Sequence, residues 1–159
     1  MKTATVTELK KELKTRSQED LVEICLKLSK FKKENKELLT YLLYESDNEQ
    51  LYIANVKQEI ELQFLEINRK TPYFIKKSVR KISRNTKKYI RYSKQKETEV
   101  ELLMHFCVVL KDMKPSISRD SVLTNIYQRQ IEVITKKISG LHDDLQFDYA
   151  RELENLSDL

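Results

Sequence analysis

TPYFIKKSVRKISRNTKKYIRY, residues 71 to 92, is the stretch that decides the fold. Thr71 can cap a helix that begins at Pro72, because the N–H that proline lacks has no partner at the first helical position anyway. At 100° per residue, four side chains fall within about 40° of Ile75: Val79, Ile82, Thr86 and Tyr89. Between about 100° and 240° from Ile75 lie eight cations: Lys76, Lys77, Arg80, Lys81, Arg84, Lys87, Lys88 and Arg91. The pattern predicts one continuous helix over residues 72–92 with an apolar face and a cationic face.

The charge of this stretch is unlike that of the rest of the chain. From Arg69 to Lys96 there are twelve Lys or Arg residues and no Asp or Glu. Because the whole chain has a net charge of +5, the remaining residues together carry −7. A basic helix is therefore expected within an acidic body.

The composition predicts an all-α fold. The chain has one Gly, two Pro and no Trp, whereas strands are joined by tight turns rich in Gly, Asn and Pro. Charged residues make up 35% of the 159 residues, as in amphipathic helices. We expect a compact bundle of seven or eight helices built from antiparallel hairpins, forming a single domain over residues 1–159. A short HEAT-like α-solenoid is the alternative, disfavoured because the sequence shows no convincing repeat.

Local signals place the other helices. A short helix is expected over residues 6–13, and further helices after caps at Ser17, Asn35 and Ser118 and after Ser46-Asp47-Asn48, the last of these reaching about Lys70. Gly140 is expected to end one helix in a left-handed conformation. Residues 102–110, LLMHFCVVL, are apolar on every side, which predicts the central helix.

The same features bear on the cellular compartment. The longest apolar run has nine residues, whereas a transmembrane span needs about 20. The first residues lack the apolar core of a secretory signal. Cys25 and Cys107 have apolar neighbours and no CxxC or Cys/His spacing, so we expect two buried, reduced thiols. A cytoplasmic location is the default expectation.

Motifs for catalysis, cofactors and metals are weak. With one glycine, none of GxGxxG, GxxxxGK[ST] or GxSxG is possible. Glu101 and His105 are four residues apart on one helix face, which favours a hydrogen-bonded pair, with a proton relay or half a metal site as the alternative. His142-Asp143-Asp144 with Asp148 offers cation ligands, but acids are expected at a helix start in any case. We therefore expect no catalytic residues, no metal and no cofactor.

Aromatic residues near the expected helix contacts have two interpretations. Core packing is the expected one, and a ligand pocket between hairpins is the sharper alternative. The residues concerned are Tyr41, Tyr44, Tyr52, Phe64 and Phe74.

The cationic face needs something anionic to relieve its repulsion. Nucleic acid is one possibility, an acidic protein surface is another, and water with salt is the third. The acidic surface could be the chain's own, since Asp144, Asp148 and Glu152 line one face of the last helix, or a partner's. A membrane is disfavoured, because the apolar face is needed for the core.

These observations lead to a functional hypothesis. We expect a non-enzymatic binding or scaffold module, in its sharpest form a nucleic-acid backbone binder of low sequence specificity. A protein-interaction or structural subunit is the alternative, and an enzyme using Glu101 and His105 a further one; the oligomeric state stays open. The expected contact residues are Lys77, Arg80, Lys81, Arg84, Lys87, Lys88 and Arg91, with Tyr73 and Tyr92 for base stacking or phosphate contact.

Two resemblances add to this reading. Residues 21–28 (LVEICLKL) and 35–43 (NKELLTYLL) resemble the opening hairpin of uncharacterised bacterial all-helical proteins, which implies a fold but no activity. The hairpins and basic residues also resemble, more loosely, HEAT-like DNA alkylation repair proteins, which present basic residues to a DNA backbone. No catalytic acid or aromatic motif of that family is found here, so the resemblance implies no glycosylase chemistry.

Overall fold

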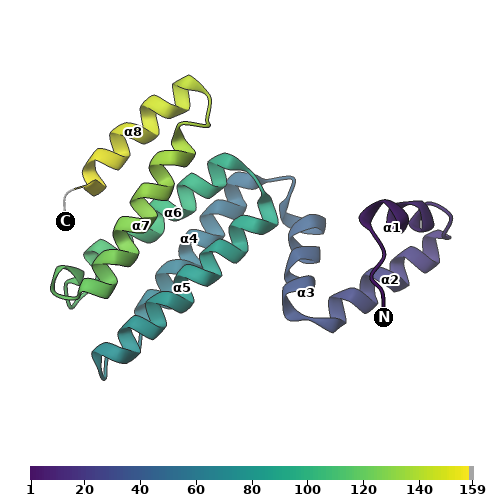
Figure 1. The fold of residues 1–159 in the computed structure, drawn as a ribbon, viewed down its shortest axis with the longest axis horizontal. Helices are drawn as coiled ribbons and strands as arrows, with labels where there is room; N and C mark the ends of the chain where they lie inside the picture. The colour runs from purple at the N-terminus through teal and green to yellow at the C-terminus, as the bar shows by residue number, and fades with distance from the viewer. Residues whose placement is uncertain (158–159) are drawn as a thin grey trace. The chain divides into compact units, whose positions relative to one another are not determined.

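The computed structural model describes residues 1–157, and within them it is helical without a single strand (Figure 1). This confirms the predicted all-α class. The chain divides into two compact units, one from Met1 to Tyr44 and one that begins at Glu45. The sequence analysis predicted a single domain over residues 1–159 and did not predict this division.

The first unit contains three α-helices and most of a π-helical turn. They are α1 (Val6–Leu13), α2 (Gln18–Phe31), α3 (Lys33–Thr40) and the turn η1 (Tyr41–Glu45). A capping box starts α1: the Glu8 N–H donates to Thr5 Oγ1 at 3.3 Å, and the Thr5 N–H donates to Glu8 Oε2 at 2.7 Å. Ser17 caps α2, as predicted, by accepting from the Asp20 N–H at 3.1 Å.

Helices α2 and α3 contact each other at a corner of the chain, with only Lys32 between them, and do not fold back as a hairpin (Figure 1). Asn35 was expected to cap the second helix, and that prediction is wrong. α3 already begins at Lys33, and Asn35 Nδ2 donates to the Leu28 carbonyl at 2.9 Å. The side chain thus satisfies one of the last carbonyls of α2, which lack intrahelical partners.

The first unit buries very little. Tyr41 is its one buried residue, and no residue of α1 is buried; Val6 is 82% exposed. The expected burial of Cys25 is wrong. Its thiol lies exposed on α2, because a unit as small as this one does not enclose a core. Tyr44 is likewise 80% exposed rather than part of a core.

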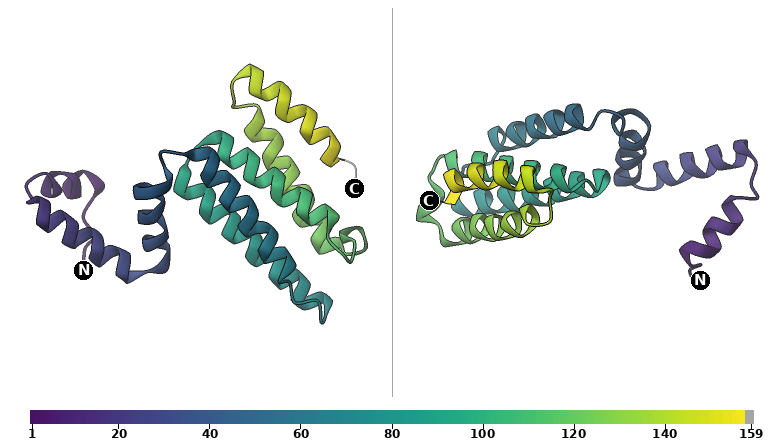
Figure 2. Two further views of the ribbon diagram at one scale, coloured as in Figure 1. Left: turned by 180° about the vertical axis from the view of Figure 1, so that it is seen from behind. Right: turned by 90° about the horizontal axis from the view of Figure 1, so that it is seen from above.

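The second unit is a bundle of five α-helices. They are α4 (Glu49–Leu65), α5 (Pro72–Ser93), α6 (Lys96–Asp112), α7 (Ser121–Ile138) and α8 (Asp143–Ser157), with a 3₁₀ turn η2 (Ile117–Arg119) before α7. Consecutive helices run back and forth and pack against each other (Figure 2). The predicted helical hairpins are therefore found here.

Helix α6 forms the centre of this bundle, as its sequence predicts. It packs against α4, α5, α7 and α8, and eight of its side chains are buried. The Phe106 ring lies 5.6 Å from that of Phe64 on α4. Cys107 is buried, as expected, and this burial raises the pKa of its thiol to about 12.

Tyrosine hydroxyls tie neighbouring elements to this core. Tyr127 on α7 donates to the Leu156 carbonyl at 2.6 Å, and Tyr52 on α4 donates to the Tyr89 carbonyl at 2.9 Å. The expected core packing of Tyr41, Tyr52 and Phe64 is confirmed, whereas Phe74 stays 38% exposed.

Several helix ends differ from the sequence expectation. Asn48 caps α4 as predicted, but α4 ends at Leu65 and not near residue 70. Asp120, not Ser118, caps α7, because Ser118 lies in the 3₁₀ turn. Gly140 does not have a positive φ; Lys94, with φ of 59°, is the left-handed residue.

Two further findings concern the described residues alone. No helix in them combines the length and the apolar character that a membrane crossing requires. The one cis peptide bond recorded there precedes Pro115.

The two thiols should differ strongly in reactivity. Because Cys25 is exposed and Cys107 is buried, the native protein should release one equivalent of chromophore rapidly from a disulfide reagent and the second only on unfolding. A Cys25→Ser variant should lose the rapid phase and keep the slow one. Two rapid equivalents in the native protein would contradict the described burial of α6.

Candidate nucleic-acid interface

Helix α5 is continuous from Pro72 to Ser93, which confirms the predicted rod. Thr71 accepts from the Phe74 N–H at 3.4 Å, and Pro72 takes the first helical position. At the other end, the Lys94 N–H donates to the Ile90 carbonyl at 3.0 Å. No break interrupts the spacing of its charges.

One side of α5 is packed into the bundle. Ile75, Val79, Ile82 and Ile90 are buried against the neighbouring helices α4, α6 and α7. Thr86 is buried with them, and its hydroxyl donates to the Ile82 carbonyl at 3.0 Å. This packing fixes the rotation of α5 about its axis.

The opposite side of α5 carries the exposed cations, hereafter called the α5 cationic face. On a helical projection they occupy an arc of about 120° centred opposite the buried side. From first to last they span fourteen residues, or about 21 Å at 1.5 Å per residue. Within residues 1–157 none of them forms an ion pair with a carboxylate. The six are Lys77, Arg80, Lys81, Arg84, Lys87 and Arg91.

The other two cations of the helix have partners inside the bundle. Lys76 Nζ lies 3.2 Å from Asp120 Oδ2, at the start of α7. Lys88, expected in the contact face, is half-buried, with its Nζ 4.9 Å from the centre of the Tyr89 ring. Lys88 thus falls within the arc of the α5 cationic face but is not one of its six exposed cations.

Asp120 shows how such pairing acts on a carboxylate. Burial acts to raise its pKa, but hydrogen bonds from the Leu123 N–H, Lys76 and the Val122 N–H outweigh burial and lower it. The stabilisation from this carboxylate is therefore present above the ordinary pKa of an aspartate and is lost as the pH falls through the lower, folded value.

The two tyrosines expected beside the cations have different positions. Tyr73 is 64% exposed in the first turn, with its ring edge-on to Phe74. Tyr92 is buried and packs edge-on against Tyr89. The expectation that Tyr92 contributes to the contact surface is wrong, because its long ring turns from the flank of the helix into the bundle.

The chain's own acidic helix does not cover the α5 cationic face in the described residues. Helix α8 packs against α6 and α7, and none of its carboxylates forms an ion pair with a cation of α5. The i, i+4, i+8 row of Asp144, Asp148 and Glu152 is exposed. Asp120, from α7, does pair with a cation of α5, Lys76.

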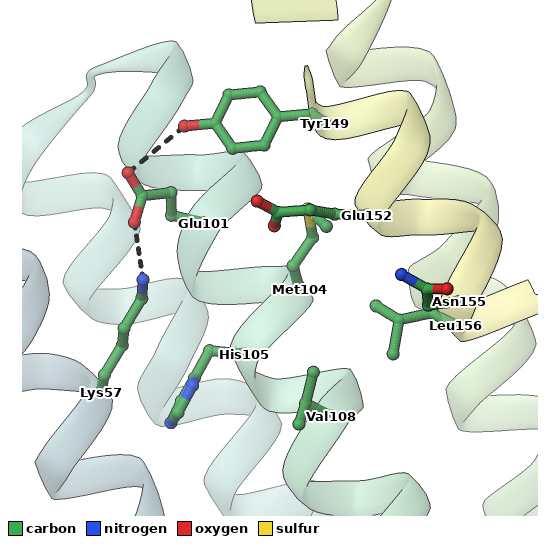
Figure 3. A pocket seen from close by; sticks show the side chains of 9 residues that line it. All are labelled: Lys57, Glu101, Met104, His105, Val108, Tyr149, Glu152, Asn155 and Leu156. Atoms are coloured by element: carbon green, nitrogen blue, oxygen red, sulfur yellow. Dashed lines mark hydrogen bonds and ion pairs between the residues drawn. The ribbon is translucent and has the colours of Figure 1, made fainter. Parts of the chain in front are cut away.

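Glu101 and His105, the candidates for chemistry, lie beside a cavity of about 450 Å³ (Figure 3). Glu101 joins three helices: Lys57 Nζ of α4 is 2.6 Å from its Oε2, and the Tyr149 hydroxyl of α8 donates to its Oε1 at 3.2 Å. Burial, reinforced by the Glu101 charge, raises the pKa of Tyr149 well above its usual range. Both carboxylate oxygens of Glu101 are therefore engaged in holding helices together.

His105 is directed to a different partner. Its buried Nε2 lies 3.1 Å from Glu61 Oε1. Burial lowers the pKa of His105, and the Lys57 charge adds to this, against the opposing effect of Glu61. The imidazole thus lies against Glu61 rather than the expected Glu101.

The C-terminal acids do not gather into a site. His142 Nδ1 is 3.8 Å from Asp144 Oδ2, and both side chains are largely exposed. Over residues 1–157, no three His, Cys, Asp or Glu side chains lie close enough to hold a metal ion.

The Lys57–Glu101–Tyr149 contact is the feature that the sequence reasoning missed. Its members lie 44 and 48 residues apart in the chain. The sequence does contain one signal for this contact. Lys57 follows Val56 of the apolar stripe of α4, and a lysine at such a position suggests a partly buried cation that needs a carboxylate.

Comparisons with protein-family models, curated proteins and solved structures give no match to this chain. The two resemblances drawn from the sequence therefore stay predictions.

Neutralising single cations of α5 should change stability in opposite directions. Arg84→Gln should raise the unfolding free energy by a few tenths of a kcal/mol at low salt, because it removes repulsion from like charges three and four residues away. Lys76→Gln, the matched change on the same helix, should lower it by about 0.5 kcal/mol through the lost Asp120 contact. Urea unfolding at two salt concentrations measures both, and a decrease for Arg84→Gln would contradict the absence of a carboxylate partner.

Proposed function

We propose that this protein binds the phosphate backbone of nucleic acid through the α5 cationic face, with low sequence specificity. The observation that carries the proposal is the set of six exposed cations in one arc, none of them paired with a carboxylate within residues 1–157. The helix maintains this repulsion at a cost in stability, and a polyanion relieves it.

The dimensions of the face suit a phosphate backbone. Double-stranded DNA carries one negative charge per about 1.7 Å of its axis, so a row of cations about 21 Å long meets several phosphates at once. Each phosphate neutralised releases condensed counterions, which is the main source of sequence-independent affinity. Rigid packing of α5 against the bundle holds the cations in place before binding.

The residue types on the face support backbone contact over base readout. Half of the six are lysines, which act as point charges rather than as the bidentate donors that read guanine. No Asn or Gln belongs to the six, so the pairing of an amide with adenine has no donor among them. Tyr73, exposed at the first turn of α5, offers a ring for stacking on an unpaired base.

Binding should depend steeply on salt. If about five phosphates are neutralised on duplex DNA, log Kd plotted against log salt should have a slope of about 4 to 5. Fluorescence anisotropy with mixed-sequence duplexes measures this slope, and different sequences should give similar values. A slope near zero, or no binding at low salt, would contradict the proposal.

A triple charge reversal should show whether binding depends on the α5 cationic face or on the net charge of the protein. Arg80→Glu, Arg84→Glu and Lys87→Glu together should weaken binding by at least a hundredfold, because attraction becomes repulsion at the centre of the face. The thermal midpoint should change little, since all three side chains are exposed.

The matched control reverses three exposed lysines of the first unit: Lys27→Glu, Lys30→Glu and Lys36→Glu. It changes the net charge by the same amount and should retain most of the affinity. Equal loss in both triple variants would show that net charge, not this face, governs binding. A loss of folding in the first variant alone would instead indicate that the basic helix pairs with an acidic surface.

A further inference from the structure

A groove runs along α6 on the side that α5 does not cover. Two adjoining cavities, of about 450 and 480 Å³, share His105 and Val108 as lining residues. Together they extend along α6 from Glu101 to Asp112, eleven residues or about 17 Å. Figure 3 shows the first cavity, with Lys57 of α4 on one side and Glu152 of α8 on the other.

The groove has an apolar floor, an acid on its α8 wall, and both bases and an acid on its α4 wall, where Lys57 is already paired with Glu101. Met104 and Val108 of α6 line the floor, and Val108 is 41% exposed. The α8 wall carries Glu152, which has no ion-pair partner within residues 1–157. The α4 side carries Lys57 and, just beyond the helix, Arg69. Glu61, the acid on that side, lies against His105. A groove of this kind accepts an amphipathic helix through its apolar stripe.

Helix α1 has the matching pattern. Val6, Leu9 and Leu13 fall within about 60° of one another on its surface, and all three are exposed. Lys10 and Lys14 flank this stripe on one side, and Glu12 flanks it on the other. With eight residues, α1 is about 12 Å long, which fits within the groove.

The first unit also needs a cover for these side chains. Tyr41 is its one buried residue, and a unit of this size seldom encloses a core by itself. An exposed apolar stripe on a short helix is destabilising in water and marks a surface that makes further contacts.

We infer that α1 of a second copy of this chain seats in the α4–α6–α8 groove. Leu9 and Leu13 lie on the floor near Val108, Lys10 faces Glu152, and Glu12 faces Arg69. Two copies exchange their α1 helices across a two-fold axis, so that each donates one helix and receives one. This symmetry doubles the contact and closes the assembly as a dimer. The α5 cationic face takes no part, so the inference does not rest on the proposed function.

The oligomeric state of the full chain tests this inference. Sedimentation equilibrium over micromolar to millimolar concentrations should give a mass that rises toward twice the 19.0 kDa of one chain. Leu9→Asp, on the stripe, should raise the dimer dissociation constant at least tenfold. Thr7→Asp, on the polar side of the same helix, is the matched control and should leave it unchanged. Val108→Asp should act like Leu9→Asp from the groove side.

A charge swap makes the test independent of folding defects. Lys10→Glu and Glu152→Lys should each weaken dimerisation, because each places like charges together in both exchanged contacts. In an equimolar mixture, one copy of each variant forms a heterodimer in which both contacts again join opposite charges. The mixture should therefore regain the doubled mass that each variant alone lacks.

Three results would overturn the inference: a mass of one chain at every concentration, equal effects of Leu9→Asp and Thr7→Asp, or a mixture that stays monomeric. The triple reversal of Arg80, Arg84 and Lys87 should still dimerise. Its loss of nucleic-acid binding with an intact dimer separates failure of one proposal from failure of the other.

Discussion

The burial of α6 on every side except the one that lines the groove is the constraint on which the rest of the bundle depends. A helix with Leu102, Met104 and Leu110 on different sides is stable only when neighbours cover each of them. Helices α4, α5, α7 and α8 provide that cover. Because α5 docks through its one apolar side, its rotation is fixed, and its cations must face away from the core. The electrostatics of the surface thus follows from the packing of the centre.

The arrangement of charge is asymmetric for the same reason. Helix α8 binds the centre through Leu153 and Leu156, so its carboxylates point away from α5. Lys76 is the exception, because the α7 cap Asp120 comes close to the first turn of α5. Glu101 is engaged by Lys57 and Tyr149 and so holds α4, α6 and α8 together. Acids that serve as caps and inter-helix links are not available to neutralise the α5 cationic face, so none of its six cations has a carboxylate partner within residues 1–157.

The sequence predicts those features that depend on local chemistry. The Thr71–Pro72 start, the period of α5 and the apolar surround of α6 are all encoded within single segments, and each is confirmed. Tyr92 was missed because it lies at the flank of α5, where only the position of Tyr89 decides whether the ring turns inward. The Glu101 contact was missed because its partners come from α4 and α8, and helix order in space is not written in the spacing of residues. Gly140 was misjudged because α7 ends with Ser139 in a right-handed conformation, so no left-handed residue is required.

The division of the chain at Tyr44 and Glu45 was hidden from sequence reasoning, since charged and apolar residues alternate in the same way on both sides of it. What differs is enclosure. Four helices around α6 bury a continuous core, whereas α1, α2 and α3 bury no residue and the turn after them buries one tyrosine. Isolated helices of eight residues are unstable in water, and most helical stability comes from tertiary packing. The apolar stripe of α1 therefore has no cover within its own unit. The apolar side of α5, by contrast, is packed into the bundle, and its charged side is exposed. The two proposals thus give the two helices different partners, an apolar groove for α1 and an anion for α5. One chain can bind both partners at once because the two surfaces share no residues.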